Sequence, residues 1–78
     1  MRTRNPNAEI VLDIKIAITD WWWEHCYPPT IRDISHTLGI STSHVLHHVN
    51  WLRDEGWLTY EDGKSRTIVP EVVRSFLQ

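Results

Sequence analysis

The chain lacks the features that mark secreted and membrane proteins. It contains one cysteine, Cys26, which has no second cysteine in the chain with which to form a disulfide bond. No stretch of about 18 apolar residues is available to span a bilayer, and the first residues, MRTRNPNAE, turn polar too early for a signal peptide. These absences favour a reducing compartment, so we expect a cytoplasmic protein without a membrane partner, folded as one small domain of 78 residues.

Positive charge is also scarce. Eight Lys and Arg stand against ten Asp and Glu, which gives a formal net charge of −2, whereas many DNA-binding domains are basic. The charges are not evenly spread, however. Four acidic residues gather within residues 9–24. Most of the basic residues lie outside this segment: Arg2, Arg4, Arg32, Arg53, Lys64 and Arg66. The sequence is therefore compatible with a locally basic face on an acidic protein, which would attract nucleic acid weakly.

Catalytic and metal-binding patterns are missing too. The sequence shows no Ser/His/Asp or Cys/His arrangement in a supporting context and no glycine-rich phosphate loop, and so short a chain cannot enclose a deep pocket. His44 and His48 are four residues apart, a spacing that can ligate zinc on a helix, but no nearby Cys, Asp or Glu completes the set. We therefore expect neither an enzyme nor a bound metal or other cofactor.

The chain does contain a succession of helix signals. Apolar residues recur at three- and four-residue spacing over residues 8–25, which predicts a first helix with one buried stripe: Ile10, Ile14, Ala17, Ile18, Trp21 and Trp22. Pro28 and Pro29 cannot continue this helix. The triple tryptophan at residues 21–23 could alternatively stack on single-stranded bases, but its place in a periodic helix favours packing.

Two shorter helices are expected next. Thr30, with Asp33 three residues later, is typical of a helix start, and Gly39 supplies the left-handed backbone that ends a helix sharply. Ser41 is placed to cap a third helix that runs to about Glu55. Apolar residues fall where a helix-turn-helix pair would bury them: Ile31, Ile34, Leu38, Ile40, Val45, Val49 and Leu52.

A β-hairpin is expected after Gly56. Residues 57–60 have the pattern of a strand, Asp62 and Gly63 that of a turn, and residues 66–69 that of the returning strand. The fold class is therefore mainly α (α+β): a three-helix winged helix-turn-helix with a C-terminal β-hairpin wing and a short tail. We divide the chain into a flexible N-terminal arm (residues 1–7), the winged helix-turn-helix domain (residues 8–69) and a tail (residues 70–78). The tail is either a short helix or an extended arm.

The segment YPPTIRDI at residues 27–34 resembles the start of the second helix in the DNA-binding domain of LexA repressors. The stretch LGISTSHVLHHVNWLRDEGWL that follows is similar to winged-helix repressors more broadly, including MarR-type and GntR-type regulators. LexA repressors also have a self-cleaving Ser-Lys domain, which these residues do not include. The resemblance implies a recognition helix at residues 41–55 and a wing at residues 61–66, with these side chains facing DNA: Ser41, Thr42, Ser43, His44, His47, Asn50, Lys64 and Arg66.

The side chains of the third helix have chemistry that suits a DNA surface. Serine and threonine donate to phosphates or base edges, Asn50 can bind adenine through two hydrogen bonds, and Leu46 can contact a thymine methyl group. Protonation of His44, His47 and His48 would add positive charge near the phosphates, which predicts a pH-dependent affinity. The competing interpretation is that this face is simply the solvated side of a structural helix.

Two further regions could contact the DNA backbone. Arg32 stands at the start of the second helix, where it either binds a phosphate together with the helix N-terminus or pairs with Asp33 or another acidic residue. In the wing, Glu61 and Asp62 would repel phosphate, so we expect contact only at the tip, near Lys64.

The first helix is apolar on two faces, which predicts an interface. Leu12, Ile16 and Trp23 lie nearly opposite the core stripe, and a small monomer has too few elements to cover both sides. Either the tail, which includes Val72, folds back over these residues or a second chain covers them. We expect a homodimer built from the first helix and the tail, through Leu12, Ile16, Trp23, Val73, Phe76 and Leu77.

Two functions are compatible with these observations. The first is a sequence-specific regulator of transcription that binds double-stranded DNA, a repressor rather than an activator, in the cytoplasm of a bacterium or archaeon or encoded by a phage. The second is a winged-helix adaptor that binds another protein, such as an anti-repressor or assembly subunit, and not DNA. The acidic balance and the apolar first helix favour the adaptor, and the polar third helix favours the regulator.

Overall fold

The first helix, α1 (Ala8–His25), is the longest element of the protein. The computed structural model describes residues 8–76, so the expected arm at residues 1–7 and the interface residue Leu77 lie outside it. Ile14 and Ile18 are fully buried on one face of α1, as their four-residue spacing predicts. After the helix, Cys26 takes a φ of 62°, in the left-handed region, and the chain turns toward the two prolines.

The second helix, α2 (Ile31–Leu38), begins with a complete capping box. The Thr30 hydroxyl oxygen accepts a hydrogen bond from the Asp33 amide at 2.9 Å, and the Asp33 carboxylate accepts one from the Thr30 amide at 3.0 Å. At the other end Gly39 has φ 70°, and its amide donates to the Ser35 carbonyl oxygen at 2.8 Å. The predicted ends of this helix are confirmed because local residues set both of them.

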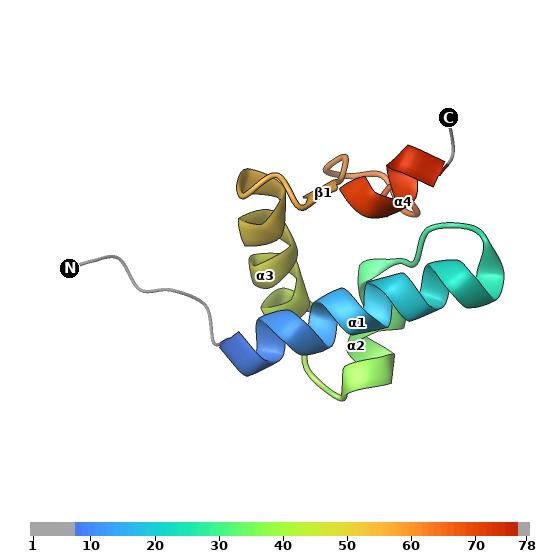
Figure 1. The fold of residues 1–78 in the computed structure, drawn as a ribbon. Helices are drawn as coiled ribbons and strands as arrows, with labels where there is room; N and C mark the ends of the chain where they lie inside the picture. Colours follow the sequence, from blue (N-terminus) through green and yellow to red (C-terminus); the bar gives the residue numbers. More distant parts are fainter. Residues whose placement is uncertain (1–7, 77–78) are drawn as a thin grey trace.

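The third helix, α3 (Thr42–Asp54), is capped by Ser41, whose hydroxyl oxygen accepts from the His44 amide at 3.1 Å. The helix ends one residue earlier than predicted, with Glu55 as its C-cap. α2 packs against both α1 and α3. In Figure 1, α3 stands at a steep angle to α1, and the short link from Gly39 to Ser41 joins α2 to α3 as a helix-turn-helix.

The hairpin is shorter than the sequence predicts. Its strands, β1 (Leu58–Thr59) and β2 (Val69–Pro70), pair antiparallel with Leu58 opposite Pro70 and Thr59 opposite Val69. Arg66 was expected to begin the returning strand, but it has φ 57° and lies in the loop between the strands. A left-handed residue cannot continue an extended strand, so regular pairing is confined to the base of the hairpin.

The tail takes the helical form of the two alternatives. It forms α4 (Glu71–Phe76), which follows β2 directly, and the Glu71 amide donates to the Trp57 carbonyl oxygen at 2.9 Å. Figure 1 shows α4 in red on the same side of α1 as the hairpin, above the C-terminal part of α1. α4 therefore belongs to the folded domain and is not a free extension of it.

One cluster of buried side chains connects the helices to the hairpin. Ile31, Leu38 and Ile40 lie half-buried at its edge, so the apolar residues predicted for the helix pair all take part. The members of the cluster are Ile14, Ile18, Ile34, Val45, Val49, Leu52, Leu58 and Ile68. Within residues 8–76, no helix is both long enough and apolar enough to cross a membrane.

Candidate nucleic-acid interface

The outer face of α3 presents most of the predicted recognition residues to solvent. Thr42, Ser43, His44 and His47 are exposed, and Leu46 keeps 37% of its surface accessible. Ser41 is exposed as well, but its oxygen already caps the helix. This face therefore offers hydroxyl, imidazole and small apolar groups, a mixture that can contact the base edges of a major groove.

Asn50 lies at the edge of this face and not fully on it. The residue is half-buried, and its Oδ1 is buried without a hydrogen-bond partner. Two-bond recognition of adenine needs both the amide oxygen and the amide nitrogen to face the groove. The predicted adenine contact therefore requires the side-chain amide to turn outward first.

His48 is buried, which corrects the prediction that it would lie near phosphates. It keeps only 2% of its surface, its Nδ1 lies 2.9 Å from the His44 carbonyl oxygen, and its Nε2 is buried without a partner. Its three-residue spacing from Val45 and four-residue spacing from Leu52 place it on the buried stripe of α3, a signal that was present in the sequence. The described residues contain no group of three or more His, Cys, Asp or Glu able to hold a metal ion.

Arg32 is exposed at the start of α2 and does not pair with Asp33. Instead, Asp33 accepts hydrogen bonds from Thr30 and from Arg66, whose Nη1 lies 3.4 Å from the Asp33 Oδ2. Burial would raise the pKa of Asp33, but the hydrogen bonds from Thr30 and the charge of Arg66 hold that pKa below its usual value. Among the described side chains Arg32 makes no ion pair, so its charge is available to a phosphate.

The acidic residues of the wing are paired with cations. The Glu61 carboxylate lies 3.5 Å from the Lys64 ammonium, and Asp62 lies 3.1 Å from the guanidinium of Arg53. Arg53, on α3, also donates to the Tyr60 carbonyl oxygen at 3.0 Å, so it supports the base of the wing. Sequence reasoning gave Arg53 no such role, because the contact depends on how the hairpin folds back over α3.

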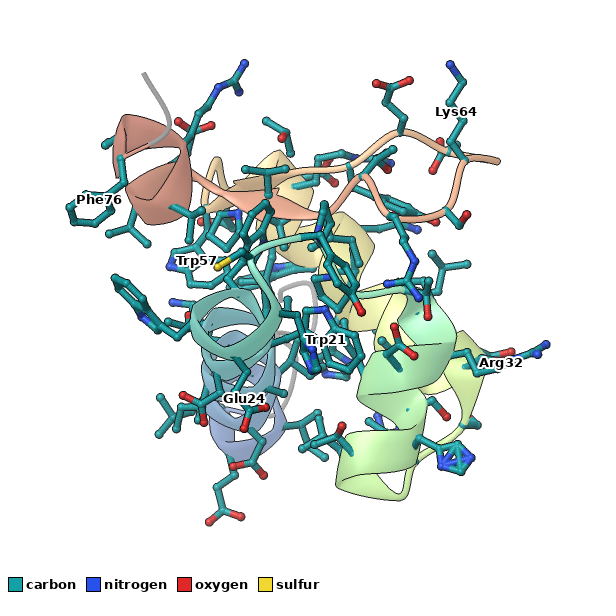
Figure 2. The ribbon with its side chains drawn as sticks, turned by 90° about the vertical axis from the view of Figure 1, so that its right-hand side faces the viewer. Trp21, Glu24, Arg32, Trp57, Lys64 and Phe76 are labelled. Carbon is teal, nitrogen blue, oxygen red and sulfur yellow. The ribbon has the colours of Figure 1, made fainter. Side chains whose placement is uncertain are left out.

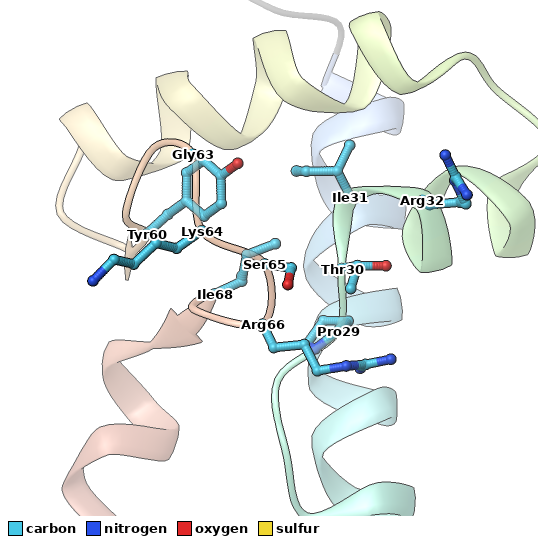
Figure 3. A pocket seen from close by; sticks show the side chains of 10 residues that line it. All are labelled: Pro29, Thr30, Ile31, Arg32, Tyr60, Gly63, Lys64, Ser65, Arg66 and Ile68. Atoms are coloured by element: carbon cyan, nitrogen blue, oxygen red, sulfur yellow. The ribbon is translucent and has the colours of Figure 1, made fainter.

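A cleft of about 390 Å³ lies between the start of α2 and the wing. Figure 3 shows Arg32 on the α2 side of the cleft and Lys64 on the wing side, with Arg66 also on the wing, at the edge near Pro29. Three hydroxyl-bearing residues that were not predicted as site residues also line the cleft: Thr30, Tyr60 and Ser65. Cationic side chains and hydroxyl groups around one cleft form a surface suited to the phosphates of a DNA backbone.

An apolar surface lies on another side of the protein. Leu12 and Ile16 are 56% and 49% exposed, and Trp23 and Phe76 are 69% and 71% exposed. The rings of Trp23 and Phe76 lie 6.1 Å apart and flank a small apolar pocket of about 150 Å³. In Figure 2, Phe76 lies on the opposite side of the molecule from Arg32 and Lys64. The tail thus covers the second apolar face of α1 only near its C-terminal end, beside Trp23, and leaves Leu12 and Ile16 exposed.

Val73 does not lie on this surface as an exposed contact. It is buried, with 9% of its surface accessible, and it lines the inner wall of the small apolar pocket. The side chain packs inward because α4 directs one face toward the core. The sequence could not predict which face, because it left open whether the tail is a helix or an extended arm. Val73 therefore contributes to the packing of the single chain and does not lie at an exposed interface.

Three helices, the second and third joined as a helix-turn-helix, followed by a β-hairpin wing, define a winged helix-turn-helix domain. In a helix-turn-helix domain the second helix of the pair, which is α3 in this fold, enters the major groove of DNA.

The family described as LexA DNA binding domain matches residues 8–67 of the chain. The LexA repressor of Geotalea uraniireducens (strain Rf4) is 46% identical over 70 residues, which cover 88% of this chain and 33% of that protein. The LexA repressor of Sorangium cellulosum (strain So ce56) is 48% identical over 48 residues, which cover 60% of this chain and 21% of that protein. The chain belongs to the LexA DNA-binding domain family, and it spans at most a third of the length of these relatives.

Proposed function

We propose that this chain binds double-stranded DNA with sequence specificity and represses transcription by occupying an operator. The observation that carries the proposal is the exposed polar face of α3 beside a cleft lined by Arg32 and Lys64. Membership of a DNA-binding domain family supports the binding, and the names of the relatives, all LexA repressors, support repression. The geometry and the family both favour this function over the adaptor.

In this proposal α3 enters the major groove and the wing follows the backbone beside it. Thr42, Ser43 and His47 contact base edges, and Leu46 contacts a thymine methyl group. Ser41 and His44, at the start of α3, lie near the DNA backbone. Asn50 contacts a base only after its side-chain amide has turned outward. Arg32 and Lys64 neutralise phosphates, which fixes the orientation of α3 but reads no sequence.

Binding alone would perform this function, without catalysis, metal or other cofactor. A regulator of this kind acts where the chromosome is, so we place it in the bacterial cytoplasm, in keeping with the bacterial sources of its relatives. The residues that act are those of the winged helix over residues 8–69, and α4 packs against it as part of the same folded domain.

Selection of bound fragments from random-sequence duplex DNA tests the proposal directly. We expect a shared sequence motif to be enriched, and we expect the affinity for it to fall steeply between about 50 and 200 mM salt. Ser43→Ala and His47→Ala should each reduce discrimination between the motif and random DNA. Thr37→Ala, a change at an exposed residue of α2 outside the predicted site, is the matched control and should leave discrimination unchanged. No enrichment by the wild-type protein would refute the proposal and leave the adaptor in its place.

We also propose that the apolar surface of α1 and α4 binds a second copy of this chain. A two-fold interface must be self-complementary, and this surface contains both a projecting ring, Phe76, and a hollow of about 150 Å³ beside it. A hollow of that size accommodates one aromatic ring. Because the surface lies away from Arg32 and Lys64, both copies could bind DNA at once, and they would read a two-fold symmetric operator.

Sedimentation of the wild-type protein and of two charge-introducing variants tests the dimer. Trp23→Glu should convert dimers to monomers, because a carboxylate would then be buried without a partner at the centre of the interface. Leu46→Glu introduces the same charge at an exposed apolar residue of α3, and it should leave the mass unchanged. A wild-type protein that is monomeric at every concentration would contradict this interface.

A further inference from the structure

Arg66 is directed toward the protein, although its position in the sequence suggested a contact with DNA. Its Nη1 donates to the Pro28 carbonyl oxygen at 3.0 Å and to the Asp33 carboxylate at 3.4 Å. Its guanidinium also lies over the Tyr27 ring, 4.9 Å from the ring centre. These contacts join the wing to a segment that lies more than 30 residues earlier in the chain.

The backbone at this contact is held in an uncommon conformation. Arg66 has φ 57°, and Cys26, which directly precedes Tyr27, has φ 62°; they are the non-glycine residues with positive φ in the described part of the chain. Such conformations cost energy in residues with a Cβ atom, and they persist only where the surrounding structure imposes them. Both residues with this uncommon backbone conformation therefore lie at, or next to, the contact between the wing and the α1–α2 loop.

Asp33 connects this contact to the start of α2. Its Oδ2 accepts the Thr30 amide at 3.0 Å as part of the capping box, and the same atom accepts the Arg66 guanidinium. Because the Asp33 carboxylate accepts hydrogen bonds from both Thr30 and Arg66, it fixes the wing relative to the first turn of α2. Arg32 belongs to that turn, and Lys64 lies two residues before Arg66 in the wing.

We propose that Arg66 is a positioning residue, which holds the wing against the start of α2 and so keeps Arg32 and Lys64 on opposite sides of the cleft. The inference rests on the proposed DNA-binding function: the cleft would receive a backbone phosphate between those two cations, and Arg66 would act through Lys64. An Arg66 that instead bound its own phosphate would contribute independently of Lys64.

The dependence of affinity on salt separates the two roles. Each lost phosphate contact lowers the slope of log affinity against log salt by about 0.9. The variants are Lys64→Ala, Arg66→Gly and their combination, measured on a duplex recovered by selection from random DNA. Glycine is chosen at residue 66 because it accepts a positive φ, so the side chain with its guanidinium is removed without strain in the backbone.

If Arg66 positions Lys64, each single variant and the double variant should all lower the slope by the same amount, about 0.9. A double variant that lowers the slope by about 1.8 would show two independent phosphate contacts and would overturn the proposal. An unchanged slope in Arg66→Gly would overturn it as well.

A measurement without DNA keeps the inference testable if the protein binds none. The Lys64 amide donates to the Glu61 carbonyl oxygen at 3.2 Å within the wing, and its hydrogen exchange reports how well the wing is held. Arg66→Gly should accelerate that exchange at least tenfold, whereas Arg74→Gly, which removes an exposed Arg from α4, should not. Equal exchange in Arg66→Gly and wild type would refute the positioning role, whatever the outcome with DNA.

Discussion

The indole nitrogen of Trp22 donates a hydrogen bond to the carbonyl oxygen of Ile68 at 3.1 Å, between residues 46 positions apart in the chain. Ile68 is fully buried in the loop that leads into β2, and Trp22 packs at the edge of the same core. The bond satisfies a main-chain acceptor that regular strand pairing does not reach. It therefore attaches the end of the hairpin to α1 as well as to α3.

Replacing Trp22 with phenylalanine should destabilise the protein. The change keeps an aromatic ring but leaves the Ile68 carbonyl oxygen without this donor, which should cost about 1–2 kcal/mol of unfolding free energy. Urea unfolding followed by circular dichroism measures the loss. Trp23→Phe is the matched control at concentrations where the protein is monomeric: Trp23 is 69% exposed in the single chain, and its replacement should change stability by less than about 0.5 kcal/mol. Equal stability of the two variants would show that the bond contributes nothing.

Replacing Thr30 with alanine should lower stability by about 1 kcal/mol. The change removes the oxygen that accepts the Asp33 amide, and with it half of the capping box. Thr37→Ala changes the same residue type on an exposed face of the same helix, and it should be neutral or slightly stabilising because alanine favours helices. Thermal unfolding of the two variants against wild type decides the point, and a Thr30→Ala protein as stable as wild type would contradict it.

Asp33 should make stability depend on pH in the acid range. Burial would raise the pKa of Asp33, but the bonds from Thr30 and the charge of Arg66 outweigh it, so the folded-state pKa lies below the unfolded value of about 3.9. The contribution is fully present above about pH 4, and it is lost as pH falls through the folded-state pKa. Asp33→Asn should be less stable than wild type at neutral pH, and the difference should shrink on acidification. A difference that stays constant down to low pH would refute this account.

The helices could be predicted closely because their ends are set by residues next to them. Thr30 with Asp33 and Gly39 fix α2, and Ser41 fixes the start of α3, so local chemistry was sufficient. The strands were overestimated because the positive φ of Arg66 follows from a contact with residues far earlier in the chain. No local pattern contains that information.

The candidate site was predictable in part, for the same reason. The exposed face of α3 follows from helical spacing, and the spacing of Val45, His48 and Leu52 would also have placed His48 inside. The cleft could not be found from the sequence, because Arg32 and Lys64 are brought together only by the fold of the wing. The contacts of Arg66 with Pro28 and Asp33 could not be predicted either, because the partners of an arginine depend on tertiary contacts.

Pro70 ends β2 as a residue without an amide hydrogen, paired opposite Leu58 in a hairpin with two strands. Because proline cannot donate to a neighbouring strand, the outer edge of β2 cannot template the addition of another chain at that position. Two copies brought close together on adjacent DNA sites are thus discouraged from joining edge to edge through their wings. Under the proposed function, in which the hairpin follows the DNA backbone and the helices join two copies, Pro70 therefore helps to keep these two surfaces separate.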